Sequence, residues 1–439
     1  MGTGPAWRSS LLWVGLVVAL AATACGSDSG GPAAAAVRGV VSAAAPHVEP
    51  CGPGDAHGAT DTGVANDSLT IATIADVGGL RPDLFLGNWQ AMDAFVAFCN
   101  SMGGVNGRRL VLRKLDSALF SERAQTLNAC DTAFALVGSA AAQDASGAQA
   151  GADCGIPDIP AFSAEAPHSM APNVVEPLPN PSDTYLAGPA KYLAQRFPDA
   201  RDGAAMFYGS VGVTAVQARR QIQAYEQSGF RFTHQVPFDV VSPGFDGLVA
   251  GLGTRKLGYV SLWSEVGDFA KLLDALHGHG VRFVVAEGGQ QTYDAKFLQS
   301  SASSIEGAFI TTTTVPFAEA STSPEMQRYL HWLDVTHPGA TPTALGVQGW
   351  SAGLLFADAL RSLGSNVTRA GLLAALHRVH NWDGNGIHVP SDPGANRRSG
   401  CFMLVQVRNG AFVRAYPDRG FACSPDNVVA LPKTFSVAQ

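Results

Sequence analysis

Apolar and polar positions follow two different periods along the chain, and segments of the two kinds take turns. The run SLTIATIA at 68–75 is β-rich and predicts a strand. Residues 87–102 instead place Trp89, Met92, Phe95 and Cys99 three to four positions apart, which is the spacing of one helical face. Strands that alternate with helices of about 10–15 residues predict parallel sheets with helices on both faces.

The alternation is repeated in the second half of the chain. Strand-like runs are separated there by helical segments, and the two similar blocks join near residues 180–184, which predicts two α/β lobes. In such folds small ligands bind beyond the carboxyl ends of the strands and between domains. The predicted strands of this second block are 203–208, 230–238, 257–263, 281–287 and 306–312, with helices at 213–229 and 268–280.

The N-terminus has the features of an export signal. Arg8 precedes an uncharged apolar run whose length fits a signal-peptide core of roughly 7–15 residues and is short for a membrane span. The run ends in Ala-Thr-Ala before Cys25, a bacterial lipobox pattern that predicts lipidation of Cys25; an ordinary signal peptide is the alternative. Residues 26–65, rich in Ala, Gly, Pro, Ser and Asp, predict a flexible tether.

Charge argues against nucleic acid as a partner. The chain has 29 Lys and Arg against 36 Asp and Glu, and Arg8 is the one charged side chain of residues 1–25, so the mature chain carries a formal charge of −8. It has no basic run of the kind that follows a phosphate backbone. No second hydrophobic span occurs, so contact with a membrane is expected through the lipid anchor alone.

Six cysteines remain after Cys25, an even number that predicts disulfides in an exported chain. Six cysteines allow 15 connectivities. Proximity in sequence favours Cys130–Cys154 and Cys401–Cys423, which leaves Cys51–Cys99, although free thiols stay possible. No CxxC or CxxH spacing occurs, so no metal site is expected.

Several segments resemble the branched-chain amino acid (Leu/Ile/Val-binding) class of type 1 periplasmic binding proteins, the substrate-binding lipoproteins of ABC transporters. The most specific is the GGVNGR turn at 103–108, between the first predicted helix and the second predicted strand. The likeness spans about residues 62–425. It implies two Rossmann-like lobes with parallel sheets joined by a three-stranded hinge, an ABC permease as partner, no cofactor and no chemistry on the ligand.

The resemblance also divides the chain and suggests ligand contacts. The expected division is 1–25 signal peptide, 26–65 tether, 66–183 and 314–405 N-terminal lobe, and 184–313 and 406–430 C-terminal lobe. Ala164 and Ala142 stand where hydroxyl-bearing residues are common in amino-acid-binding members, a departure that argues against an α-amino-acid ligand. The candidate ligand contacts are Ser139, Ala140, Ser163, Ala164, Glu165, Tyr208, Trp263, Glu287 and Gln290.

The stretch GWSAG offers an enzyme alternative, because it matches the nucleophile elbow of serine hydrolases around Ser351. Asp383 and His388 follow in the chain order of a catalytic triad. However, no β-rich run precedes Gly349, and the apolar spacing predicts one helix through Ser351. No catalytic residue is therefore expected.

The sequence thus predicts an extracytoplasmic, lipid-anchored protein on the outer face of the bacterial membrane. It would capture a small polar ligand, amino-acid-like, amide or small organic acid, for an ABC importer. A ligand-sensing receptor component and a binding protein whose cleft no longer takes small ligands are the alternatives.

Overall fold

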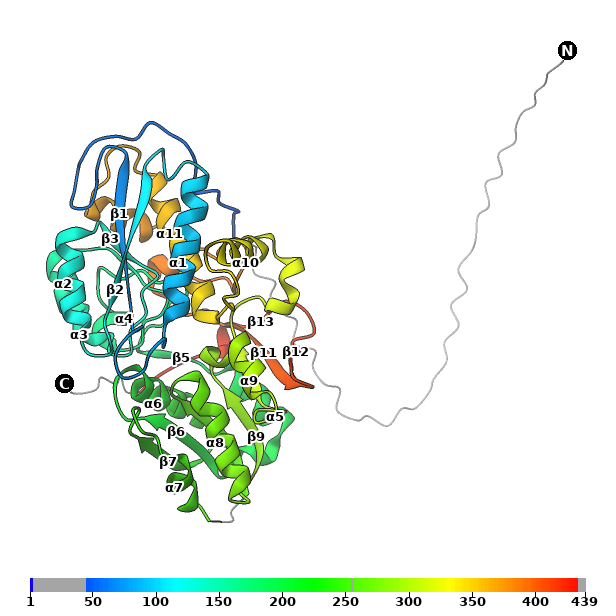
Figure 1. Cartoon of the computed structure of the whole chain (residues 1–439). Helices are drawn as coiled ribbons and strands as arrows, with labels where there is room; N and C mark the ends of the chain where they lie inside the picture. The colour runs from blue at the N-terminus through cyan, green and yellow to red at the C-terminus, as the bar shows by residue number, and fades with distance from the viewer. Residues whose placement is uncertain (3–44, 254–255, 433–439) are drawn as a thin grey trace, which may run out of the picture. The chain divides into compact units, whose positions relative to one another are not determined.

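The computed structural model describes residues 1–2, 45–253 and 256–432 (Figure 1). The described residues from 45 onward belong to one compact unit, Gly39–Gln439. Cys25, most of the expected signal peptide and residues 26–44 of the expected tether lie outside the described residues. No helix in the described part of the chain is long and apolar enough to cross a membrane.

The first sheet has four parallel strands in the order β2-β1-β3-β4. Alternate residues of β1 face opposite layers: Leu69 and Ile71 pack with one apolar cluster, and Ala72 and Ile74 pack with another. The strands are β1 (Ser68–Ala75), β2 (Arg109–Asp116), β3 (Ala135–Val137) and β4 (Asp158–Ile159). The first four helices of the described chain are α1 (Leu86–Ser101), α2 (Glu122–Thr132), α3 (Ala145–Cys154) and α4 (Ala166–Ser169).

Three later helices return to this first sheet: α10 (Pro324–Thr336), α11 (Ala344–Arg361) and α12 (Arg369–Leu376). Helix α1 packs against α10 and α11, with the Phe95 ring 5.6 Å from that of Trp350. A Cβ at Gly353 would lie 2.5 Å from the Phe95 ring, so glycine there permits the close approach of α1 and α11.

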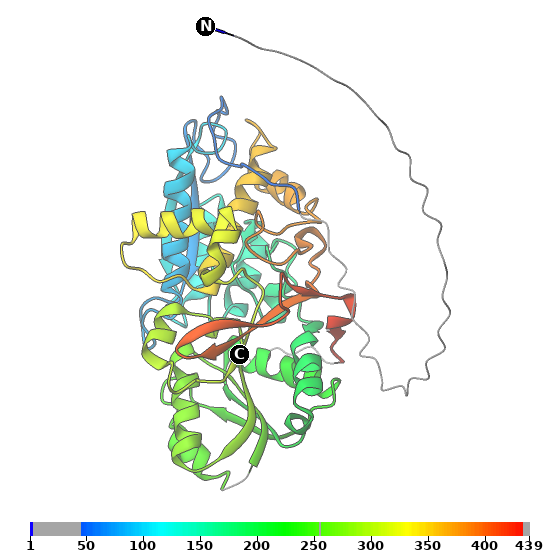
Figure 2. The ribbon, with the colours of Figure 1, turned by 90° about the vertical axis from the view of Figure 1, so that its right-hand side faces the viewer.

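The second sheet has the order β12-β11-β10-β9-β8-β6-β7, with β13 (Ala422–Cys423) paired to β11. Strands β6 to β10 pair in parallel, whereas the β11–β12 hairpin, orange to red in Figure 2, is antiparallel. The bounds are β6 (Ala204–Gly209), β7 (Phe232–Phe238), β8 (Lys256–Trp263), β9 (Arg282–Gly288), β10 (Phe309–Thr312), β11 (Cys401–Arg408) and β12 (Ala411–Tyr416).

Both faces of this sheet are covered, as the buried pattern of a parallel sheet requires. Adjacent residues of its strands enter different apolar clusters: Tyr259 in one and Val260 in the other, Val285 in one and Ala286 in the other. The helices of this lobe are α5 (Gly188–Arg196), α6 (Gly212–Glu226), α7 (Phe245–Ala250), α8 (Val266–Gly278) and α9 (Ala295–Ser301).

The chain passes between the two sheets three times: after β4, after β10 and before β11. Beside the first crossing, β5 (Thr184–Leu186) pairs antiparallel with β14 (Val428–Ala430). Strand β11 pairs with the second sheet on both sides of the boundary placed between 405 and 406, because its apolar residues complete that core. The end of the expected tether packs on the first lobe, where Cys51 is buried and the N–H of Gly52 donates to the carbonyl of Gly104.

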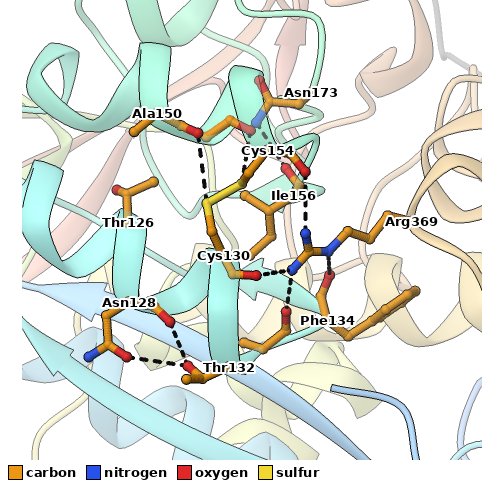
Figure 3. Close-up of a disulfide and its surroundings, with 12 residues drawn as sticks. Thr126, Asn128, Cys130, Thr132, Phe134, Ala150, Cys154, Ile156, Asn173 and Arg369 are labelled. Atoms are coloured by element: carbon orange, nitrogen blue, oxygen red, sulfur yellow. Dashed lines mark hydrogen bonds between the residues drawn. A yellow bond between two sulfur atoms is a disulfide. The ribbon is translucent and has the colours of Figure 1, made fainter. Parts of the chain in front are cut away.

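Three disulfides join the six cysteines of the described chain in the pairing favoured by sequence. Their Cα atoms lie 5.1 Å apart in Cys51–Cys99, 6.1 Å in Cys130–Cys154 and 4.0 Å in Cys401–Cys423. The second ties α2 to α3 (Figure 3). Beside it, the Arg369 guanidinium donates to the carbonyl oxygens of Cys130 and Cys154, at 2.6 and 3.2 Å.

Candidate functional site

A cavity of about 560 Å³ lies between the two lobes, within the size range of small-molecule sites. Loops at the carboxyl ends of strands from both sheets form its walls, where parallel sheets usually bind ligands. The first lobe contributes the loops after β1, β2 and β3 and the start of α11. The second lobe contributes the loops after β6, β8 and β9, so a ligand held here would contact both lobes.

Much of the wall is apolar. Aromatic and aliphatic side chains from both lobes line it, and they can bury a nonpolar ligand surface at roughly 25 cal/mol per Å². These side chains include Phe85, Phe120, Phe162, Trp263, Val266 and Leu345.

Glutamine, asparagine, serine and threonine side chains form the neutral polar part of the lining, and four of its glutamines are incompletely hydrogen-bonded. Each of these four glutamines has a buried amide atom with no hydrogen-bond partner in the described part of the chain: Oε1 of Gln217 and Gln348, and Nε2 of Gln290 and Gln291. Thr313 donates to Oε1 of Gln290 at 2.8 Å, which fixes that amide group. Buried polar atoms usually have partners, so these four side chains have unused hydrogen-bonding capacity beside the cavity.

Glu287 lines the cavity at the end of β9 and is 2 % exposed. Its carboxylate already accepts hydrogen bonds from three hydroxyls: Tyr225 and Tyr259 donate to Oε2, each at 2.8 Å, and Thr311 donates to Oε1 at 2.5 Å. Burial raises the pKa of Glu287 above its ordinary value, and the three hydroxyls oppose that shift.

Two arginines lie where the chain crosses between the lobes. Arg398 lines the cavity and donates to Oδ1 of Asn180. Arg220 is fully buried and donates to the carbonyl oxygens of Ala164 and Thr184, at 3.4 and 2.9 Å. Burial lowers the pKa of Arg398 to about 10 and that of Arg220 to about 9, so both remain cationic at neutral pH.

Of the nine ligand contacts expected from sequence, the structure places Trp263, Glu287 and Gln290 in the cavity lining. Ser139, Ala140, Ser163, Ala164, Glu165 and Tyr208 are buried and are not among the lining residues. The ligand contacts of all nine stay predictions.

Two of the residues behind the lining have hydrogen bonds that satisfy their buried hydroxyl groups. Ser139 Oγ accepts from the N–H of Ile74 at 3.1 Å, and Ser163 Oγ donates to Glu176 at 2.8 Å. Sequence reasoning missed Gln217, Gln348 and Arg398. Arg398 carried one usable signal, since it belongs to an arginine pair shortly before an apolar strand.

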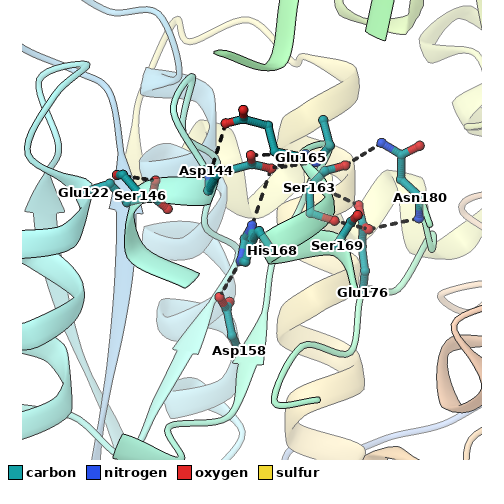
Figure 4. Close-up of polar contacts among 12 residues, drawn as sticks. Glu122, Asp144, Ser146, Asp158, Ser163, Glu165, His168, Ser169, Glu176 and Asn180 are labelled. Carbon is teal, nitrogen blue, oxygen red and sulfur yellow. Dashed lines mark hydrogen bonds and ion pairs between the residues drawn. The ribbon is translucent and has the colours of Figure 1, made fainter. Parts of the chain in front are cut away.

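A buried polar network supports the loop after β4 (Figure 4). Asp144 accepts from the backbone N–H of Ala164 at 2.6 Å and lies 3.4 Å from Nδ1 of His168. His168 Nε2 lies 2.8 Å from Asp158. Burial alone lowers the pKa of His168, but the two aspartates raise it well above its ordinary value. The network fixes a loop of the first lobe near the cavity.

Ser351 does not form a nucleophile elbow. Helix α11 begins at Ala344, capped by Thr343 Oγ1, so Ser351 lies two turns inside a helix and is fully buried. Its Oγ lies 2.8 Å from Nε2 of His388 and accepts from Trp382 Nε1 at 2.9 Å. An elbow needs a strand directly before an exposed serine.

Asp383 also does not take the place of the acid in a catalytic triad, which would accept a hydrogen bond from the histidine. His388 Nδ1 lies 2.7 Å from the carbonyl of Val389, and Asp383 accepts from the N–H of Gly386 at 2.9 Å. Burial lowers the pKa of His388, which keeps the ring neutral and leaves Nε2 as the acceptor for the Ser351 hydroxyl. Ser351 and His388 are therefore a satisfied hydrogen-bonded pair in the core. Among the described residues, no group of three or more His, Cys, Asp or Glu side chains could hold a metal ion.

Residues 68–411 match the family model described as periplasmic binding protein. The chain belongs to this family, whose members bind solutes and are not enzymes, and it has the type 1 periplasmic binding protein fold. No curated protein matches the chain.

Solved structures with the same fold include three binding proteins of ABC transporters. A fatty acid ABC transporter substrate-binding protein from Thermomonospora curvata has a TM-score of 0.69 at 17% identity, covering 81% of this chain and 93% of its own. A solute-binding protein from R. palustris in complex with benzoate has a TM-score of 0.66 at 16% identity, covering 83% and 98%. The branched-chain amino acid protein LivJ from Streptococcus pneumoniae, in complex with isoleucine, has a TM-score of 0.67 at 12% identity, covering 80% and 100%.

Proposed function

We propose that this protein captures a small ligand in the cavity between its lobes and delivers it to an ABC importer. The observation that carries the proposal is that both lobes line one cavity with glutamine side chains. Gln217 and Gln290 of the second lobe and Gln348 of the first each have a buried amide atom without a hydrogen-bond partner among the described residues. A ligand bonded to both lobes stabilises the state in which they are together, because that state alone offers all of the contacts.

The ligand is a small organic molecule with a polar group and an apolar body. The apolar wall and the few polar groups support this composition. The structurally similar proteins named above were solved with benzoate or isoleucine, or are described as binding fatty acids. At 12–17% identity they support the cavity's use as a ligand site without identifying the ligand.

Cys25 is the lipid attachment site, and the chain after it is a tether that holds the binding unit outside the cytoplasmic membrane. The apolar run and the small residues before Cys25 support this assignment. Mass spectrometry of the mature N-terminus tests it: a diacylglyceryl mass on Cys25 is expected and should be absent from Cys25→Ser. An unmodified N-terminus in the wild-type membrane fraction would refute the anchor.

Ligand capture is tested by thermal unfolding with a panel of amino acids, amides, short-chain and aromatic acids, and polyols. A ligand at 100 times its Kd adds about 2.7 kcal/mol to the free energy of unfolding, which gives a shift of several degrees. A specific shift supports capture. No shift with any compound, in protein verified as folded and ligand-free, would favour a cleft that no longer takes small ligands.

Delivery to an importer is separated from ligand sensing by an uptake assay. Cells that carry the chain and its partner permease should accumulate a labelled ligand, and cells that lack the chain should not. Equal uptake by both would support the sensory alternative.

A further inference from the structure

Arg398 is a half-buried cation that lines the cavity and has few partners among the described residues. Its guanidinium lies over the Tyr185 ring, 5.5 Å from the ring centre, and donates to Asn180. Its Nε atom is buried and has no hydrogen-bond partner among residues 45–253 and 256–432. Among the described residues, no Asp or Glu lies within ion-pair distance of Arg398.

The surroundings add positive charge to this part of the cavity. Arg220 lies near enough to interact with Arg398 and also lacks a carboxylate partner among the described residues. The buried acid that acts on both arginines is Glu176, and burial raises its pKa to about 8, so it is mostly neutral at pH 7. Asp183, which also acts on Arg398, is solvent-exposed. Arg220 is fully buried and Arg398 is half-buried. Charge that is shielded from water without a counter-ion is costly, and an anion bound to Arg398 would reduce that cost.

The rest of the lining limits which other chemical groups an anionic ligand can have. A ligand ammonium group would need an acidic acceptor. Of the acids in the lining, Glu287 already accepts hydrogen bonds from three hydroxyls and Glu265 is paired with Arg81. Asp294 accepts from the N–H of Phe297, and Asp83 is solvent-exposed. The four glutamine amides can bond a single polar substituent, and the aromatic wall accommodates an apolar body. Arginine is suited to the carboxylate because its planar fork can donate two parallel hydrogen bonds.

We infer that the cavity binds a monocarboxylate with an apolar body, and that the Arg398 guanidinium holds the carboxylate where the lobes join. This inference rests on the proposed function, since it names the ligand class of the same site. Asn180 and Tyr185 are positioning residues, because they hold the guanidinium in place from the first crossing segment.

The test is calorimetric titration of the purified full-length chain with matched acids and neutral analogues. The probes are benzoate, 4-methylpentanoate and octanoate, with the amide of each and with leucine and phenylalanine. At least one acid should bind, and its amide should bind about 30-fold or more weakly, as loss of a buried charge contact requires.

Variants then locate the contact. Arg398→Gln should weaken the acid about 30-fold or more and leave its amide within about threefold, and Arg398→Lys should fall between. Arg397→Gln is the matched control, since Arg397 is the adjacent arginine and its side chain is 75% exposed. Thermal unfolding of each variant verifies that it is folded.

The outcomes separate this inference from the proposed function. If an amide or an amino acid binds and the acids do not, capture stands and the monocarboxylate class is overturned. If an acid binds equally to wild type and folded Arg398→Gln, the role of Arg398 is overturned. If no compound binds to folded, ligand-free protein, both the inference and the proposed capture fail.

Discussion

Replacing Arg81 with alanine should speed ligand release, because Arg81 bonds the two lobes together across the cavity. Arg81 lies in the loop after β1 of the first lobe. It donates from Nε to Glu265 at 2.8 Å and from one NH2 group to Asp268 at 3.0 Å. A further bond joins it to the carbonyl of Val240 at 2.5 Å. All three acceptors belong to the second lobe, so these bonds form only when the lobes are together.

The free energy that the closed state loses in Arg81→Ala depends on how deeply the ion pair is buried and on the partners that Asp268 keeps. The Arg81 side chain is 12% exposed and Asp268 is fully buried, so the pair is well shielded from water. Removing one member of a buried pair costs about 3–5 kcal/mol when the other is left without partners. Here Asp268 keeps Ser264 at 2.7 Å and Lys271 at 3.0 Å, so we expect about 2 kcal/mol. That free energy corresponds to roughly a 30-fold change in the ratio of closed to open molecules.

Stopped-flow dissociation of the best ligand is the assay. The off-rate of Arg81→Ala should rise about 30-fold, with a small change in the on-rate. Arg231→Ala is the control, because Arg231 pairs with Asp202 within one lobe and both side chains are about 70% exposed. Since Arg81 also lines the cavity, a double-mutant cycle with Glu265→Ala separates the bond between lobes from direct ligand contact. An Arg81→Ala off-rate within twofold of wild type, or strictly additive effects in the cycle, would refute the reasoning.

Two further predictions concern stability. Burial raises the pKa of Glu176 from 4.5 to about 8, so the folded protein keeps a proton that the unfolded chain releases. The contribution of Glu176 to the free energy of unfolding is therefore fully present below pH 4.5 and is lost as pH rises through 8, by an upper bound on the order of 5 kcal/mol. In urea unfolding, the Glu176→Gln variant should show a flatter decline of stability between pH 5 and 8. The control Glu226→Gln, at an exposed position, should keep the wild-type decline. An unchanged pH profile in Glu176→Gln would contradict the raised pKa of Glu176. Replacing both Cys51 and Cys99 with alanine removes a crosslink that spans 48 residues. The free energy of unfolding should fall by roughly 4 kcal/mol, because the unfolded chain is no longer constrained by the loop. An unchanged denaturation midpoint under non-reducing conditions would show that the crosslink does not constrain the unfolded chain.

Sequence patterns predicted the parts of the fold that depend on local spacing. The strand at 68–75, the helix that contains Phe95 and Cys99, and the helix through Ser351 all lie where their periodicity places them. The cysteine pairing could also be predicted from the sequence, because two of the three pairs are close in the chain. The sheet to which β11 belongs could not be predicted in this way, because β11 pairs with β10, which lies about 90 residues earlier in the chain.

The cavity was predictable only in part, because a lining depends on which side chains other segments cover. Glu287 and Trp263 follow strands and do reach the lining. Ser139 and Ser163 also follow strands, but hydrogen bonds to Ile74 and Glu176 hold them in the interior. Arg398 was missed because its surroundings come from segments more than 200 residues away in sequence.

The central claim is that a ligand occupies the cavity between the lobes, and a cavity-filling substitution tests it most directly. Ala142 lines the cavity and is half-buried, so a tryptophan there would fill ligand space, whereas Ala250 at the exposed end of α7 offers a matched control. By calorimetry, the best ligand should bind wild type and Ala250→Trp with one-to-one stoichiometry and should not bind folded Ala142→Trp. Equal affinity in all three proteins would place the ligand elsewhere and contradict the account.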